Sequence, residues 1–289
     1  MIDPTTLPRG LRRIIKPAVY GYRSFTAGLR VLPDFLIIGA QRAGTTYLYN
    51  NLAAHPCVAP ALTKEVHFFD VWFERGLGWY RSFFPLRAQR LIWQARGLPL
   101  LAGEASPYYL FHPHAPRRAA ATLPRARLIA LLRNPVDRAY SQYHHSRRRG
   151  FEMLPFAEAI AQERARLAGQ ETRLIADERA SSDSHQNWSY QARGVYADQI
   201  ARWLEYFPRE QLLVLQSEQL YADPARHMQR VFEFLDLPSW QPKRLRRPET
   251  PRYADMDAAT RRALQASFAP HNARLYDLLG TRFDWDEDQ

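Results

Sequence analysis

The chain has 289 residues, with 40 lysines and arginines against 29 aspartates and glutamates, a formal charge of +11 and 46% hydrophobic residues. A chain of this length and composition buries a large core, which excludes global disorder. No apolar run approaches the ~18 residues of a membrane span, so we expect no ordinary transmembrane segment.

The basic residues are mostly arginines, because Lys16, Lys64 and Lys243 are the only lysines. Such a charge permits attraction to polyanions without identifying one. Cys57 is the single cysteine, so no disulfide within the chain is possible and no oxidising compartment is needed. The first residues lack the apolar core of a secretory signal, and we expect a cytoplasmic protein.

Residues 1–33 form a predicted basic arm, in which six basic residues face Asp3 alone. One interpretation is a solvated arm, and the other is contact with an anionic substrate or peripheral contact with a membrane surface. Residues 34–289 show no linker or repeat and are predicted to form one domain.

Apolar runs alternate with amphipathic stretches along this domain. Strands are predicted at 34–39, 128–132 and 212–215, and helices at 45–55, 135–148, 196–207, 224–235 and 257–279. Asn134 is the expected N-cap of the second helix, with Pro135 at its first position. The polar stretch 180–187 is predicted to be a mobile loop. Buried strands alternating with helices predict an α/β fold with a central parallel sheet flanked by helices.

The most informative segment is 39–46, which reads Gly-Ala-Gln-Arg-Ala-Gly-Thr-Thr between a strand and a helix. Such a turn directs backbone N–H groups and a helix N-terminus at one point, which suits a phosphate. The spacing is that of a P-loop, but Thr45 stands where the lysine belongs and the cation is Arg42 instead. An ordinary Mg-ATP hydrolase is therefore disfavoured.

This segment carries a family resemblance. Residues 35–48, followed by His55-Pro56, resemble the 5′-phosphosulfate loop of sulfotransferases that use 3′-phosphoadenosine 5′-phosphosulfate (PAPS), and residues 131–141 resemble the 3′-phosphate motif of that family. The resemblance implies a P-loop NTPase-like sulfotransferase fold, PAPS as sulfuryl donor and 3′,5′-ADP as product. The cofactor-binding residues that it implies are Gln41, Arg42, Ala43, Gly44, Thr45, Thr46, Arg133, Ser141 and Tyr253.

The blocks 64–70, 76–80, 115–120, 193–204 and 280–285 resemble the heparan-type glycosaminoglycan sulfotransferases. This implies Glu65 as the general base that deprotonates the acceptor, His67 as an assisting residue, and Arg42 as the cation on the leaving phosphate. Two of these residues have an alternative interpretation. Glu65 could be a surface residue that pairs with Lys64, and His67 could be a packed, hydrogen-bonded histidine without a catalytic role. Ala105 replaces a lysine of those enzymes, and an arginine of 246–252 is a candidate 3′-phosphate ligand.

The predicted function is sulfuryl transfer to a hydroxyl or amine of a saccharide, glycolipid or small metabolite, with no metal and no nucleic acid partner. The alternatives are a P-loop kinase and a catalytically inactive nucleotide-binding protein. Asp137 and Arg138, inside the second motif, are interpreted as solvated helix charges or a local ion pair. The sequence leaves the acceptor and the oligomeric state open.

Overall fold

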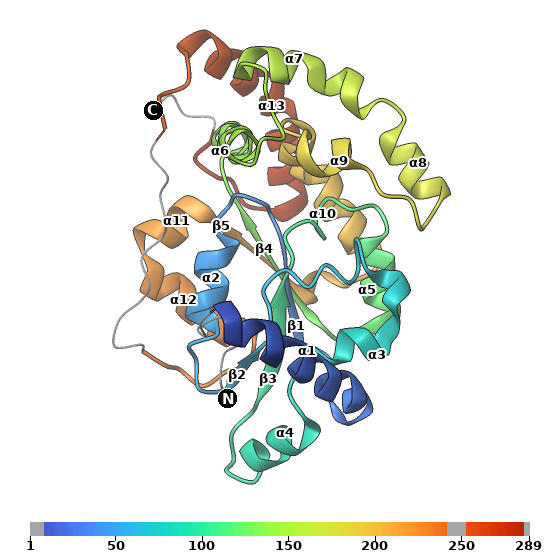
Figure 1. The fold of residues 1–289 in the computed structure, drawn as a ribbon. Helices are drawn as coiled ribbons and strands as arrows, with labels where there is room; N and C mark the ends of the chain where they lie inside the picture. The colour runs from blue at the N-terminus through green and yellow to red at the C-terminus, as the bar shows by residue number, and fades with distance from the viewer. Residues whose placement is uncertain (1–8, 242–252, 286–289) are drawn as a thin grey trace.

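The fold is a five-stranded parallel sheet with helices on both faces, as predicted (Figure 1). A computed structural model describes residues 9–241 and 253–285, with side chains from residue 17 onward. The strands are β1 (Phe35–Gly39), β2 (Val58–Pro60), β3 (Leu101–Ala105), β4 (Arg127–Leu132) and β5 (Leu212–Gln216), and their order in the sheet is β2-β3-β1-β4-β5.

The helices along the chain connect and cover these strands. They are α1 (Arg9–Phe25), α2 (Thr45–Leu52), α3 (Gly76–Arg81), α4 (Arg87–Gln94), α5 (Ala115–Thr122), α6 (Pro135–Arg148), α7 (Phe156–Leu167), α8 (Gln170–Ala176), α9 (Asp183–Asn187), α10 (Tyr196–Leu204), α11 (Ser217–Ala222), α12 (Pro224–Phe234) and α13 (Ala258–Leu279), with short 3-10 turns between some of them. Figure 1 shows α2, α11 and α12 on one side of the sheet and α5 and α10 on the other. Among the described residues, no helix has the length and apolar composition of a membrane span.

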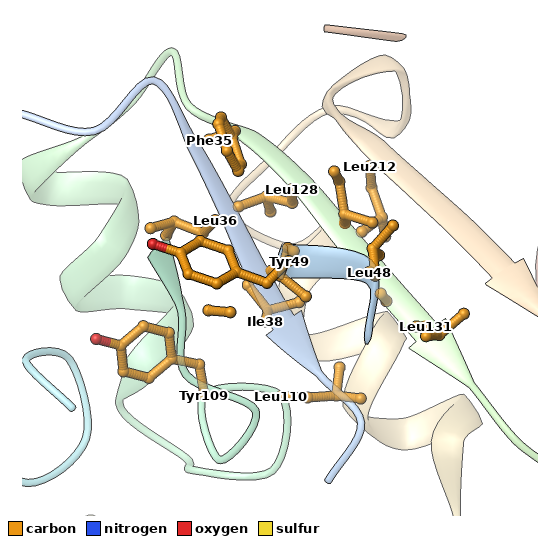
Figure 2. Packing of buried hydrophobic residues seen from close by; sticks show 14 of the residues in the cluster. Phe35, Leu36, Ile38, Leu48, Tyr49, Tyr109, Leu110, Leu128, Leu131 and Leu212 are labelled. Carbon is orange, nitrogen blue, oxygen red and sulfur yellow. The ribbon is translucent and has the colours of Figure 1, made fainter. Parts of the chain in front are cut away.

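The core forms around β1, whose five residues are all buried. Figure 2 shows Leu48 and Tyr49 of α2 among the buried side chains beside β1 and β4. Because both faces of β1 are covered, its sequence is a continuous apolar run rather than an alternating one. The predicted strands and long helices are present, with ends within three residues of the expectation.

The sequence analysis did not predict strands β2 and β3, and the composition of β3 explains why. Glu104 lies inside β3 and is fully buried, so its charge interrupts the apolar pattern. Gly103 also weakens the strand signal, yet the fold requires glycine there, because a Cβ would come within 2.1 Å of the Phe35 ring. Tertiary packing therefore overrides the local propensity of this segment.

The prediction of a mobile loop at 180–187 is wrong. The segment contains α9, whose N-cap Ser182 accepts a hydrogen bond from the His185 amide. The His185 ring is buried and stacks on Phe111 at 4.1 Å between ring centroids, and Arg193 donates to the His185 carbonyl at 2.9 Å. Partners distant in sequence thus order a segment whose own composition is polar.

Candidate active site at the carboxyl edge of the sheet

The glycine loop leaves the carboxyl end of β1, the central strand, with β3 on one side and β4 on the other. Ligands of open α/β sheets bind at such a point, where the chain turns to opposite sides. Gly44 caps α2 with a φ of +93°, and a Cβ there would lie 2.1 Å from the Tyr221 hydroxyl. The loop therefore needs glycine for both its conformation and its close packing.

The two predicted phosphate motifs meet at this loop. Arg42 Nε donates to Ser141 Oγ at 3.1 Å, although 99 residues separate them. Arg133 Nη1 donates to the Arg42 carbonyl at 3.4 Å. Asn134 caps α6 by accepting from the Val136 amide at 3.0 Å, as predicted. The parallel pairing of β1 with β4 brings these residues together, because it places both carboxyl ends at one edge.

The loop carries positive charge without a matching carboxylate. Among the described residues, Arg42, Arg133 and Arg148 form no ion pair. Burial lowers the pKa of the Arg42 guanidinium, and the charges on Arg148 and Arg133 lower it further. Cations held near one another at a helix N-terminus form a site for a polyanion.

The second cluster follows β2 and joins the end of β3. Glu65 donates its amide to the Ala105 carbonyl at 3.0 Å, and its carboxylate accepts from Lys64 Nζ at 2.5 Å. His67 Nε2 lies 3.6 Å from the other carboxylate oxygen of Glu65, and His67 Nδ1 lies 2.8 Å from Asp70 Oδ2. Glu65 and His67 have positive φ values of 61° and 56°, which is strain typical of functional residues.

This chain of groups sets the charge state of the cluster. Burial raises the pKa of Glu65, but the hydrogen bond from His67 and the charge on Lys64 outweigh it and hold that pKa at about 2. Burial lowers the pKa of His67, but the charge and hydrogen bond of Asp70, together with Glu65, raise it to about 10. At neutral pH the histidine is therefore a cation between two carboxylates.

The sequence did not single out Asp70, which fixes the His67 ring from a fully buried position. Its spacing of three residues from the histidine was the available signal. Ser106 was also missed: its hydroxyl accepts from the His67 amide at 3.1 Å and donates to Glu104 at 2.8 Å. A buried network thus holds the backbone of the catalytic candidates.

Two arginines behind the loop are buried rather than solvated. Arg138 is fully buried and donates to Gln142 Oε1 at 2.6 Å and to the Tyr190 carbonyl, so its interpretation as a solvated helix charge is wrong. Its neighbour Asp137 pairs with Arg261 at 2.9 Å, across to α13. Arg193, which the sequence analysis did not single out, is also buried and donates to Gln41 Oε1.

The remaining predicted ligands lie around α6 and α2. The Tyr253 ring stacks on His144 of α6, with centroids 4.2 Å apart and planes 7° apart. Thr45 is buried at the start of α2, and Thr46 is exposed. Ala43, between Arg42 and Gly44, is buried. The candidate arginines Arg246, Arg247 and Arg252 lie outside the described residues.

A cavity of about 280 Å³ lies beside Asp70. Its walls include Tyr108, His112 and Arg118, and also residues of 174–186, the stretch that carries α9. The cluster that ends in Asp70 therefore lies next to an open hollow lined partly by polar and charged side chains.

Comparison with known proteins places this site in context. The family model described as "Sulfotransferase domain" matches residues 32–250. The chain is 31% identical to human heparan sulfate glucosamine 3-O-sulfotransferase 6, over 89% of this chain and 75% of that protein. It is 33% identical to human bifunctional heparan sulfate N-deacetylase/N-sulfotransferase 3, over 86% of this chain and 30% of that protein. The crystal structure of a sulfotransferase from Alicyclobacillus acidocaldarius superposes with a TM-score of 0.68 at 31% identity, over 89% of this chain and 100% of that one.

Proposed function

Because the chain belongs to the sulfotransferase domain family and is an enzyme of that kind, we propose that its donor is PAPS and that Glu65 is its general base. The proposed acceptor group is a hydroxyl or an amine. When bound, PAPS supplies the activated sulfuryl group and leaves as 3′,5′-ADP.

The observation that carries the donor assignment is the cluster of Arg42, Arg133 and Ser141 around the glycine loop. PAPS carries phosphate at its 5′ and 3′ positions, so it needs cations and hydroxyl donors at two places. The glycine loop follows β1 and the second motif follows β4, and the pairing of these strands brings the two motifs to one edge of the sheet. Guanidinium groups bind phosphate oxygens in a bidentate manner and keep their charge at all working pH values. Arg42 therefore stabilises the negative charge that develops on the leaving phosphate, and acts electrostatically rather than as a proton donor.

For the acceptor we propose a saccharide. The relatives above are named for heparan sulfate, one as a 3-O-sulfotransferase and one as an N-sulfotransferase, so both a hydroxyl and an amine have precedent among them. In this chain Ala105 is buried and supplies no cation. Ser141 and Arg148 share one face of α6, and Ser141 contacts Arg42, so this helix adds a cation beside the donor site.

Glu65 is suited to take the acceptor proton. Lys64 and His67 keep its carboxylate ionised, so it is ready to accept a proton throughout the neutral range. Its low pKa also favours prompt release of that proton, which restores the carboxylate after each turnover. Lys64 and His67 contact the two oxygens of the carboxylate, and Asp70 holds His67, so together they fix the orientation of Glu65.

The test compares Glu65→Gln with Arg42→Ala in assays of sulfuryl transfer to a desulfated heparan oligosaccharide. For Glu65→Gln we expect kcat to fall by about 10²–10⁴, the usual contribution of a general base, with unchanged affinity for 3′,5′-ADP. Arg42→Ala should weaken 3′,5′-ADP binding and turnover together. Near-normal turnover of Glu65→Gln would remove Glu65 as the base, and preference of the wild type for Mg-ATP over 3′,5′-ADP would contradict PAPS as donor.

A further inference from the structure

A second charged cavity lies at the opposite, amino-terminal edge of the sheet. It has a volume of about 580 Å³ and lies where β1 and β4 begin, between residues 30–34, α4 and residues 122–126. Figure 1 shows α4 and α6 at opposite ends of the molecule, with the sheet between them. We call this cavity the arginine pocket after the residues that line it, Arg30, Arg81, Arg87, Arg90 and Arg125.

The arginine pocket has a surplus of positive charge. Asp34 is the one acidic residue among the described residues that line it. Its Oδ2 accepts hydrogen bonds from Arg90 Nη2 at 2.5 Å and from the Ala102 amide of β3 at 2.8 Å, so both a side chain and the backbone hold this carboxylate in place. It neutralises one guanidinium, and four remain without a carboxylate partner in the described part of the chain.

Several donors of these arginines have no acceptor. The Nε atoms of Arg81 and Arg90 are enclosed, and no described residue accepts a hydrogen bond from either. Arg30 is buried and is held by hydrogen bonds to the Phe84 carbonyl at 2.8 Å and to Thr26 Oγ1 at 3.0 Å. These Nε atoms are covered by protein, so a ligand would be held by the outer guanidinium N–H groups, and an oxyanion is the group that satisfies such planar donors.

We propose that the arginine pocket binds the phosphate or sulfate group of a soluble monoester. The volume lies within the range of small-molecule sites, and Leu32, Leu91 and Leu123 offer apolar contact to the body of such a ligand. The pocket is at the edge of the sheet opposite to the glycine loop, so its ligand is separate from the reacting groups. The inference does not depend on the donor or acceptor of the proposed reaction.

The experiment titrates the full chain with inorganic phosphate and with a hexose 6-phosphate, in saturating 3′,5′-ADP to fill the other phosphate site. The pocket variant is Arg87→Gln/Arg125→Gln, since both side chains are exposed and form no ion pair among the described residues. The matched control is Arg226→Gln/Arg230→Gln on α12, which removes the same charge elsewhere on the surface. We expect affinity to fall about tenfold or more in the pocket variant and to stay within about twofold of wild type in the control, with saturable 1:1 binding in wild type.

Equal weakening in both variants would show a general effect of net charge and overturn the proposal, as would the absence of saturable binding. Binding confined to vesicles that contain phosphatidic acid would make the surface a membrane contact and would also overturn it. Sulfuryl transfer by the pocket variant should match wild type, so a negative result here is distinguishable from a failure of the proposed function.

Discussion

At the scale of single residues, the charge of Glu65 depends on its two cationic neighbours. Lys64 contacts one carboxylate oxygen and His67 approaches the other, while Asp70 holds the histidine protonated. Glu65 was predicted either as a catalytic base or as a surface partner of Lys64, and the structure shows that the ion pair exists at the proposed base. The two alternatives are therefore compatible, because the pair keeps the base ionised.

The pH profile of Lys64→Met tests this relation. Removing the ammonium takes away a group that lowers the Glu65 pKa, while burial still raises it, so the pKa must rise from about 2. We expect the acid limb of kcat/KM to move to higher pH in the variant. An unchanged acid limb, measured with a Lys64→Arg control, would contradict the role of the ammonium.

At the scale of elements, the junction of β1, the glycine loop and α2 forms the donor site. The left-handed Gly44 ends the loop, and Tyr221 of α11 packs against it from the other side. The loop is also tied to the sheet, because the Ala40 amide donates to the Leu131 carbonyl at 2.7 Å. The position of the phosphate donors therefore depends on a local turn and on packing against a distant helix.

A double-mutant cycle separates these two contributions. Gly44→Ala places a Cβ against the Tyr221 hydroxyl and forces alanine into the left-handed region, which alone costs roughly 1–2 kcal/mol. We expect lower stability to urea and weaker binding of 3′,5′-ADP. Adding Tyr221→Ala should relieve the steric part and leave the conformational part, with Tyr221→Ala alone as control. Full additivity of the two changes would contradict the contact.

At the scale of the whole molecule, the N-terminal segment packs on the domain. Arg23 is buried and donates to the carbonyls of Ser82 at 2.5 Å and Phe84 at 2.8 Å, and Arg30 shares the Phe84 carbonyl. The solvated interpretation of the arm is therefore wrong for these two arginines. Whether residues 1–33 act apart from the 34–289 domain stays a prediction.

Replacing Arg23 by alanine should measure this attachment. The change leaves the Ser82 carbonyl without its donor and the Phe84 carbonyl with Arg30 alone, and we expect a loss of about 1–3 kcal/mol in the free energy of unfolding. Urea denaturation monitored by tryptophan fluorescence gives this value, with the exposed Arg226→Ala as control. Equal stability of the two variants would show that the hydrogen bonds of Arg23 add nothing to the fold.

The sequence by itself determined the local features of this protein. The apolar run of β1, the turn from Gly39 to Gly44 and the capped start of α6 are encoded by neighbouring residues, because strand burial, left-handed turns and N-caps act over a few positions. The motifs on these elements also indicated the sulfotransferase family, which the comparisons confirm.

Tertiary structure decided where charges lie. Glu104 can lie inside a strand because Tyr80 and Tyr109 donate hydrogen bonds to its buried carboxylate. Arg138 can be buried because the Tyr190 carbonyl accepts a hydrogen bond from its guanidinium. Arg42 became a partner of Ser141, 99 residues away, only because β1 pairs with β4. The high arginine content is evident from the sequence. Which arginines lie in the donor site, in the core or in the arginine pocket depends on contacts between residues far apart in the sequence. A pattern within a short stretch of sequence carries no information about such contacts.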